Sequence, residues 1–117
     1  MKKYMAVFLG TGAKNAAWDA LDAETKKKRE QEGMVAWGKW VDDHKASIAD
    51  MGSPLGKTKK IDSSGVSDIK NDIAAWTIVQ AESHDEAAKM FENHPHFSVF
   101  PGDRVEVMEC LPMPKME

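Results

Sequence analysis

The sequence predicts an α+β fold in which two helices cover one face of a four-stranded antiparallel sheet. Within a helix expected over 22–51, residues 34–51 carry a stripe of mostly apolar side chains at alternating steps of three and four, the period of a helix against a core. A capping signal at Ser83 begins a second helix. Four segments have the composition and length of strands: 3–9, 55–61, 73–81 and 105–111. The resulting order, β-α-β-β-α-β, is the ferredoxin-like arrangement.

Length and composition predict one domain over residues 1–117. Hydrophobic residues make up 42% and charged residues 30%, as in globular rather than disordered chains. The longest apolar run, Met5 to Leu9, is too short for a membrane span or a signal peptide. Cys110 is the only cysteine, which fits a reducing cytoplasm. We therefore expect a cytoplasmic protein without membrane partners.

One basic run, Lys26 to Arg29, lies between acidic residues in a chain of net charge −3. Its field is partly cancelled, so we interpret it as a solvated helix surface rather than a phosphate-binding patch. No nucleic-acid partner is expected.

The first half of the chain begins with the strand 3–9, which Gly10-Thr11-Gly12 ends, and a loop is expected over 13–21. Asp22 is a good N-cap for the long helix, which is predicted to end near Met51, before Gly52. Gly33 is a candidate bend. The stripe expected to pack on the sheet comprises Met34, Trp37, Val41, His44, Ile48 and Met51.

In the second half, the lysines of 55–61 suit a sheet edge, and 62–72 is expected to be a polar loop. Residues 73–81 are apolar on both alternating sets, which indicates a central strand. The second helix is predicted over 83–93, and Pro95 is expected to stop it. Because the first and third strands are apolar on both faces, the uncovered sheet face predicts a homodimeric α/β barrel.

Several segments in this order resemble the YCII-related family, including its DGPF-type members. They are Lys3-Tyr4-Met5, Trp37-Gly38-Lys39-Trp40, Asp50 to Gly56, Ile73 to Ala81, Asp85-Glu86-Ala87, His94-Pro95 and Val105-Glu106-Val107. The resemblance implies a ferredoxin-like dimer with a pocket, generally without an assigned reaction. The Asp-Gly-Pro-Phe segment is absent; Val66 to Ile69 stands roughly there, so no role of that loop is carried over.

His44 and His94 are the candidate catalytic residues, because imidazole exchanges protons near neutral pH. His44 is the ionisable member of the apolar stripe; its alternative role is a hydrogen-bonded core histidine. His94 precedes Pro95, and its alternative role is to cap the C-terminus of the second helix. No carboxylate is singled out as a partner for either.

The expected substrate contacts are large apolar groups and the loop after the second helix: Tyr4, Trp37, Trp40, Trp76, His96 and Phe97. For Tyr4, Trp37, Trp40 and Trp76, core packing is the favoured interpretation and pocket lining the alternative. His94 and His96, with His44 or His84, offer too few convergent ligands for zinc, so neither a metal nor another cofactor is expected.

Three functions remain open at this point. The first is a small-molecule enzyme that uses histidine acid/base chemistry in a pocket between the first helix and the sheet. The second is a ligand-binding or accessory module without catalysis. The third is a structural dimer with an incidental cavity, because this fold hosts many activities.

Overall fold

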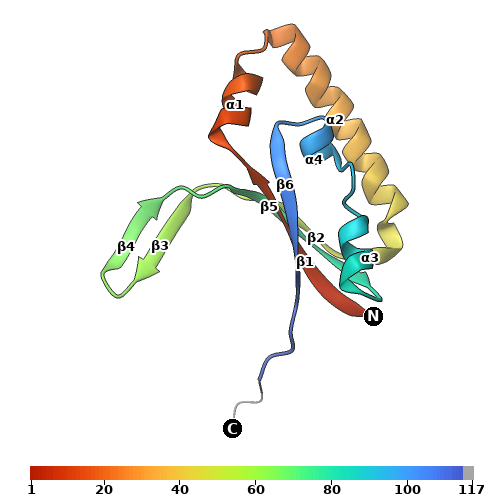
Figure 1. The fold of residues 1–117 in the computed structure, drawn as a ribbon. Coiled ribbons are helices and arrows are strands. Elements are labelled where there is room, and N and C mark those ends of the chain that lie inside the picture. The colour runs from red at the N-terminus through yellow and green to blue at the C-terminus, as the bar shows by residue number, and fades with distance from the viewer. Residues whose placement is uncertain (115–117) are drawn as a thin grey trace.

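The fold is an antiparallel sheet with helices on one face, as the sequence predicts (Figure 1). The computed structural model describes residues 1–114. The main sheet has the order β2-β5-β1-β6, and a separate hairpin pairs β3 with β4. The strands are β1 (Lys2–Gly10), β2 (Ile48–Pro54), β3 (Thr58–Asp62), β4 (Gly65–Ile69), β5 (Ile73–Ala81) and β6 (Gly102–Glu109). The helices are α1 (Gly12–Asp19), α2 (Ala23–Asp43), α3 (His84–Lys89) and α4 (Pro95–Ser98), with a 3-10 turn at Lys45–Ser47.

Strand β1 lies at the centre and pairs antiparallel with β5 and β6. Alternate side chains of β1 point to opposite faces, because the side-chain period of a strand is two. The helix-covered face holds the buried core, which comprises Tyr4, Ala6, Phe8, Trp40, Val79, Ala81, Ala87 and Phe91. The other face carries Met5 opposite Ile78, and Val7 opposite Trp76.

Three helix starts follow local capping chemistry. Asp22 caps α2 by accepting a 2.7 Å hydrogen bond from the Thr25 backbone N–H, as predicted. Ser83 caps α3 by accepting from the Glu86 N–H at 3.1 Å, also as predicted. Thr11 caps α1, so the segment expected to be a loop over 13–21 is largely helical.

The prediction that the first helix runs to Met51 is wrong. Helix α2 ends at Asp43, His44 has non-helical backbone angles, and the chain from Ile48 enters β2. The helical spacing of apolar residues continues by coincidence into the strand, where Ile48 still packs on the core. Gly52, expected as a helix stop, instead has φ +66° in a strand that pairs irregularly with β5. A Cβ there would overlap the Trp76 carbonyl, so this turn of backbone requires glycine.

The neighbour of β5 in the sheet is therefore 48–54 rather than 55–61. Residues 58–62 form β3, which pairs with β4 inside the segment expected to be a polar loop. The second helix is also shorter than predicted. It ends at Lys89, and Pro95 occupies the first turn of α4 instead of stopping α3.

Candidate functional site

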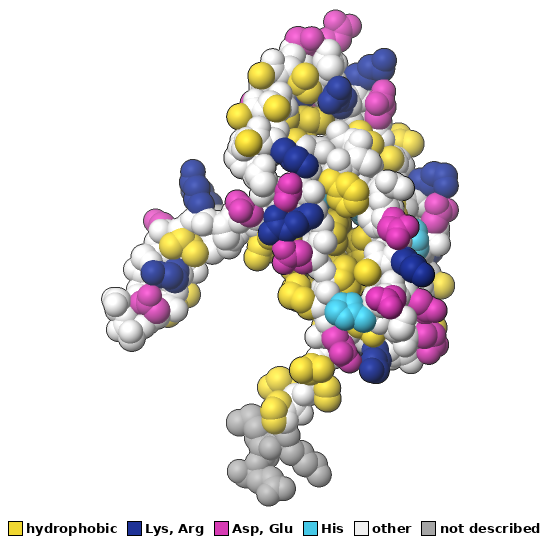
Figure 2. Space-filling view, in the orientation of Figure 1, with side chains coloured by type: hydrophobic (Ala, Val, Ile, Leu, Met, Phe, Trp, Pro, Cys, Tyr) yellow, Lys and Arg dark blue, Asp and Glu magenta, His cyan; other side chains and the backbone are white. Residues whose placement is uncertain are grey.

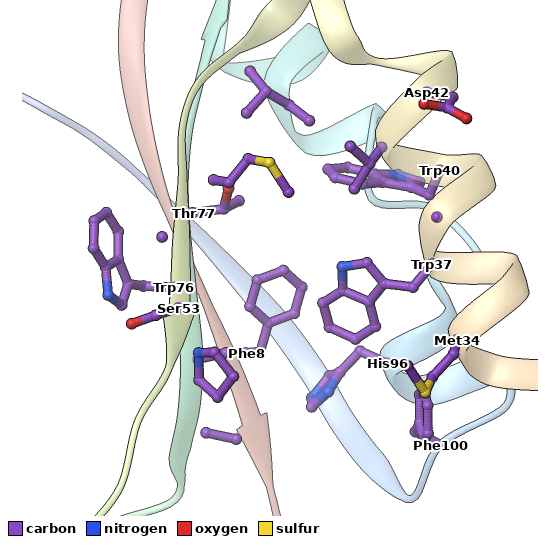
Figure 3. A pocket seen from close by; sticks show the side chains of 18 residues that line it. Phe8, Met34, Trp37, Trp40, Asp42, Ser53, Trp76, Thr77, His96 and Phe100 are labelled. Atoms are coloured by element: carbon purple, nitrogen blue, oxygen red, sulfur yellow. The ribbon is translucent and has the colours of Figure 1, made fainter. Parts of the chain in front are cut away.

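A cavity of about 760 Å³ lies between α2 and the sheet, where the sequence predicts a pocket (Figure 3). Its rim is open to solvent at Met34 and Met51, whose side chains are 71% and 63% exposed. The lining comprises Phe8, Met34, Trp37, Gly38, Trp40, Val41, Asp42, Ile48, Met51, Gly52, Ser53, Pro54, Ala74, Ala75, Trp76, Thr77, His96 and Phe100. Most of these side chains are apolar, and several are aromatic.

Trp37 and Trp40 form the helix side of the cavity. The indole N–H of Trp40 donates a 2.7 Å hydrogen bond to the Met90 carbonyl, which ties α2 to the end of α3. Trp37 is half-buried, and its ring centroid lies 5.2 Å from that of Phe8 on β1. The two tryptophans are three residues apart, so they lie on the same face of α2 and form one aromatic wall of the cavity.

Phe100 closes the same wall near the N-terminal half of α2. Its ring lies against the backbone of Gly33, and a Cβ at this position would overlap the ring. Gly33 is therefore a point of close approach between α2 and the segment after α4, rather than the predicted bend. The Phe100 ring also contacts Trp37, with centroids 6.2 Å apart.

His96 is the histidine that lines the cavity. The ring has one nitrogen fixed, because Nε2–H donates a 2.7 Å hydrogen bond to the Leu9 carbonyl. A neutral imidazole with its proton on Nε2 has an acceptor lone pair on Nδ1. Within residues 1–114 no hydrogen bond reaches that Nδ1. Burial lowers the pKa of His96, against the opposing effects of the Leu9 hydrogen bond and Asp103, so the ring is neutral at pH 7.

Gly102 provides the space in which the His96 ring lies. A Cβ at residue 102 would overlap both the imidazole and the carbonyl oxygen of His96. The first residue of β6 thus determines where the histidine of α4 can sit.

His94 lies behind the cavity wall and is fully buried. Its Nδ1 accepts a 3.0 Å hydrogen bond from the His96 backbone N–H, so His94 caps the N-terminus of α4 rather than the C-terminus of α3. The neutral ring must then carry its proton on Nε2, which has no hydrogen-bond partner. Trp37 and Trp40 surround it, with centroids 4.5 and 4.7 Å away. Burial, followed by the nearby His96 and His44, lowers the pKa of His94 to about 3.

His44 is held at the end of α2, outside the cavity. Its Nδ1–H donates a 2.8 Å hydrogen bond to the Trp40 carbonyl, and its ring lies 4.7 Å from the Trp40 indole. Trp40 therefore separates His44 from His94. The expectation that both histidines line one cavity is not met, because an indole lies between them and aromatic rings enclose His94.

The predicted substrate contacts divide into two groups. Trp37, Trp40 and His96 line the cavity, Trp76 is a lining residue whose ring points away from it (Figure 3), and Tyr4 and Phe97 do not line it. Tyr4 is buried against His84, with ring centroids 5.2 Å apart. The ring of Trp76 lies on the far side of the sheet from Trp37, so it faces the uncovered side (Figure 3).

Sequence reasoning missed two aromatic members of the site. Phe8 belongs to the first strand, and its alternation with Tyr4 and Ala6 is the signal that places it on the helix-covered face. Phe100 follows a four-residue helix that no period could reveal. Its position depends on contact with Gly33, which lies 67 residues earlier in the chain.

A smaller cavity of about 290 Å³ adjoins the first and shares Ala74, His96 and Phe100 with it. Its other lining residues are more polar and include Asn15, Asn71 and Asp72. His96 therefore lies where an apolar space meets a polar one. A ligand with an apolar ring and a polar substituent matches this division.

Among residues 1–114, no three histidine, cysteine, aspartate or glutamate side chains cluster closely enough to hold a metal ion. In the same part of the chain, no helix is both long and apolar enough to cross a membrane.

The comparisons with known proteins place the fold. No family model matches the chain, and no curated protein matches it. Among solved structures, it is similar to 5-chloro-2-hydroxyhydroquinone dehydrochlorinase from Burkholderia phenoliruptrix AC1100, in complex with 2,5-dihydroxybenzoquinone. The TM-score is 0.51 at 20% identity, covering 90% of this chain and 89% of that chain. The chain thus has a ferredoxin-like α+β fold, with a four-stranded antiparallel sheet and helices, that it shares with this structure.

Proposed function

We propose that this protein is a small-molecule enzyme that uses His96 as a general base on a planar, mainly apolar substrate. The observation that carries the proposal is the state of His96: one nitrogen is fixed by Leu9, and the other is unpaired in a ring that lines the cavity. A general base needs both a correct position and a deprotonated ring at working pH. The lowered pKa of His96 meets the second condition.

The substrate class follows from the cavity walls. Phe8, Trp37, Trp40 and Phe100 offer ring faces and edges to a flat molecule, and the adjoining polar cavity suits one polar substituent. A volume of about 760 Å³ is within the usual range for small-molecule sites. The similar dehydrochlorinase holds a cyclic ligand, 2,5-dihydroxybenzoquinone, which is consistent with a ring-shaped substrate here.

This proposal replaces His44 and His94 as proton carriers. His94 is enclosed by rings, and a pKa of about 3 makes it a poor base at neutral pH. His44 already donates to Trp40 and lies outside the lining. His96, first expected as a substrate contact, is the histidine that can reach a molecule in the cavity.

A non-catalytic ligand-binding module is the second candidate, and one observation favours it. Asp42 is the carboxylate in the lining of the larger cavity, and no hydrogen bond joins it to a histidine within residues 1–114. Without a carboxylate partner, the ring of His96 would serve binding alone.

Proton exchange of a bound ketone separates the two candidates. 2-Tetralone is a flat bicyclic ketone whose acidic C–H groups exchange in D₂O, which NMR measures directly. If His96 is a base, the protein should accelerate exchange at least about tenfold over buffer, since general bases typically contribute 10²–10⁴-fold. His96→Gln should lose the acceleration, because its amide can still donate to Leu9 but cannot take a proton.

A control for substrate binding changes a residue of α2, the helix that forms one wall of the cavity. A side chain added at Gly38 meets open space in the cavity rim. Gly38→Leu should therefore block 2-tetralone and abolish exchange, whereas Gly38→Ala should retain both. Binding without exchange in the wild-type protein would support the non-catalytic module. Equal exchange by wild type and His96→Gln would exclude His96 as the base.

The protein is further proposed to be a homodimer of the YCII-related type that works in the cytoplasm. Support for the dimer comes from the uncovered sheet face, where Met5, Trp76 and Ile78 are only half-buried in one copy and Met108 is 44% exposed. Exposed apolar faces of this kind are typical of interfaces.

A further inference from the structure

The β3–β4 hairpin leaves the body of the protein. It projects away from the helices, toward the side of the sheet that they leave uncovered (Figure 1). Its two strands pair with each other and make no extensive contact with any other described element. The radius of gyration is 16.5 Å, whereas a compact chain of this length has about 13 Å. The projecting hairpin contributes to this difference.

The hairpin exposes an apolar pair. Ile61 and Val66 lie directly opposite each other in the register, and their side chains are 72% and 66% exposed. Figure 2 shows hydrophobic side chains among charged ones on this arm. An isolated two-stranded hairpin is at best marginally stable in water. A regular hairpin with an unburied apolar pair therefore indicates a surface that packs on a partner.

The net charge of the hairpin indicates what kind of partner it fits. Residues 55–70 hold four lysines and two aspartates, a net charge of +2. The rest of the chain holds 12 basic and 17 acidic residues, a net charge of −5. The arm and the body are thus electrostatically complementary, but the arm projects away from its own body.

We propose that the hairpin is an arm that clasps a second copy of this chain, with Ile61 and Val66 packed on the partner's body. This inference rests on the proposed homodimer and adds a contact that the sheet faces alone do not provide. In a twofold-symmetric dimer, each copy contributes one arm and one surface that receives the partner's arm. Both arms are then used within the dimer, so the contact does not build an open filament.

A polyanion such as nucleic acid is a less suitable occupant. Lys59 is paired with Asp68 at 2.7 Å, and Lys60 with Asp62 at 3.3 Å, within the hairpin itself. These pairs leave few lysines to contact phosphates, and an apolar pair offers nothing to a phosphate backbone.

The test compares two double variants of the arm by sedimentation equilibrium. Ile61→Thr/Val66→Thr removes the apolar pair but keeps β-branched side chains, so the hairpin remains favoured. The matched control, Lys60→Arg/Ser67→Thr, changes a directly opposed pair on the other face of the hairpin and keeps the charge of the arm. The first variant should weaken dimerisation at least tenfold, and the control should change it less than threefold.

Amide hydrogen exchange supplies a second readout in the wild-type protein. The hairpin amides should be protected at high protein concentration and lose protection on dilution, because a free hairpin opens readily. An unchanged dimer in Ile61→Thr/Val66→Thr, with hairpin exchange independent of concentration, would overturn the clasp and leave the homodimer intact. A wild-type protein that remains monomeric at every concentration would overturn both.

Discussion

His94, His96 and His44 lie in one cluster of aromatic rings, yet each ring has a different hydrogen-bond state. His96 has a free Nδ1 at the cavity, His44 donates to Trp40, and the Nε2–H of His94 has no partner. The sequence identifies histidines as candidates because imidazole titrates near neutral pH. It cannot rank them, because burial depends on aromatic residues from α2, β1 and the segments that follow α3 and α4, which meet only in the folded chain.

Stability should fall in acid because of His94. The pKa of His94 is about 3 in the folded protein, whereas an unfolded histidine has about 6.5. Between these two pH values the unfolded state binds more protons than the folded state. The contribution of His94 to the free energy of unfolding is therefore fully present above pH 6.5 and is lost as the pH falls toward 3. From pH 7.5 to 5, His94 should contribute a loss of roughly 2 kcal/mol, measured by urea unfolding. His96 acts in the same direction.

His94→Asn is the matched variant for this pH dependence, because asparagine keeps an N-cap acceptor but does not titrate. Its stability should depend less on pH across the same interval, even if it is lower throughout. A slope equal to that of the wild-type protein would show that His94 is accessible to protons when folded.

Gly102→Ala should displace the His96 ring, since the added Cβ overlaps it. We expect a stability loss of about 1–3 kcal/mol from overpacking, together with weaker binding of 2-tetralone. Urea unfolding and NMR titration measure the two effects. Unaltered His96 resonances in this variant would contradict the close approach.

At the scale of elements, local signals predict the starts of helices better than their ends. Asp22 and Ser83 act as caps through bonds to residues three positions later, so a short window contains the whole signal. The end of α2 depends instead on β5, which pairs with residues 48–54 although it lies more than 20 residues further along the chain. The helical spacing of apolar residues continues past Asp43. It therefore could not reveal that residues 48–54 pair with β5 instead of extending the helix.

Two glycines in α2 should respond oppositely to alanine. Gly33→Ala meets the Phe100 ring and should destabilise the protein by about 1–3 kcal/mol. Gly38→Ala meets open space and should stabilise it by up to about 1 kcal/mol, because alanine favours helix. Thermal or urea unfolding of both variants measures the difference. Effects of the same sign would mean that Phe100 does not approach Gly33.

At the scale of the whole molecule, the fold class follows from the order of segments, and the predicted antiparallel sheet is confirmed. The projecting hairpin could not be predicted in the same way. The strand predicted over 55–61 overlaps β3, but its partner β4 lies within 62–72, a segment polar enough to resemble a loop. The polar composition concealed a regular element because exposed strands need few apolar residues.

Ile78→Lys should produce a monomer. Ile78 lies opposite Met5 on the uncovered face, and a lysine buried between two sheets would lose its hydration. Sedimentation equilibrium at micromolar concentration should give 13.0 kDa for the variant and twice that mass for the wild-type protein. Glu106→Gln, on the same face, is the control and should remain dimeric.

The central position of β1 has a consequence for how the chain folds. Tyr4 pairs with Val79 of β5 on one side and with Glu109 of β6 on the other. Among the strands of this sheet, β1 therefore precedes both of its partners in the chain and cannot pair until they have been synthesised. Pairings between such distant segments slow folding, because a long loop must close before either is gained. On the ribosome, β1 therefore stays unpaired until β5 emerges, and the sheet is complete only after β6 has left the exit tunnel.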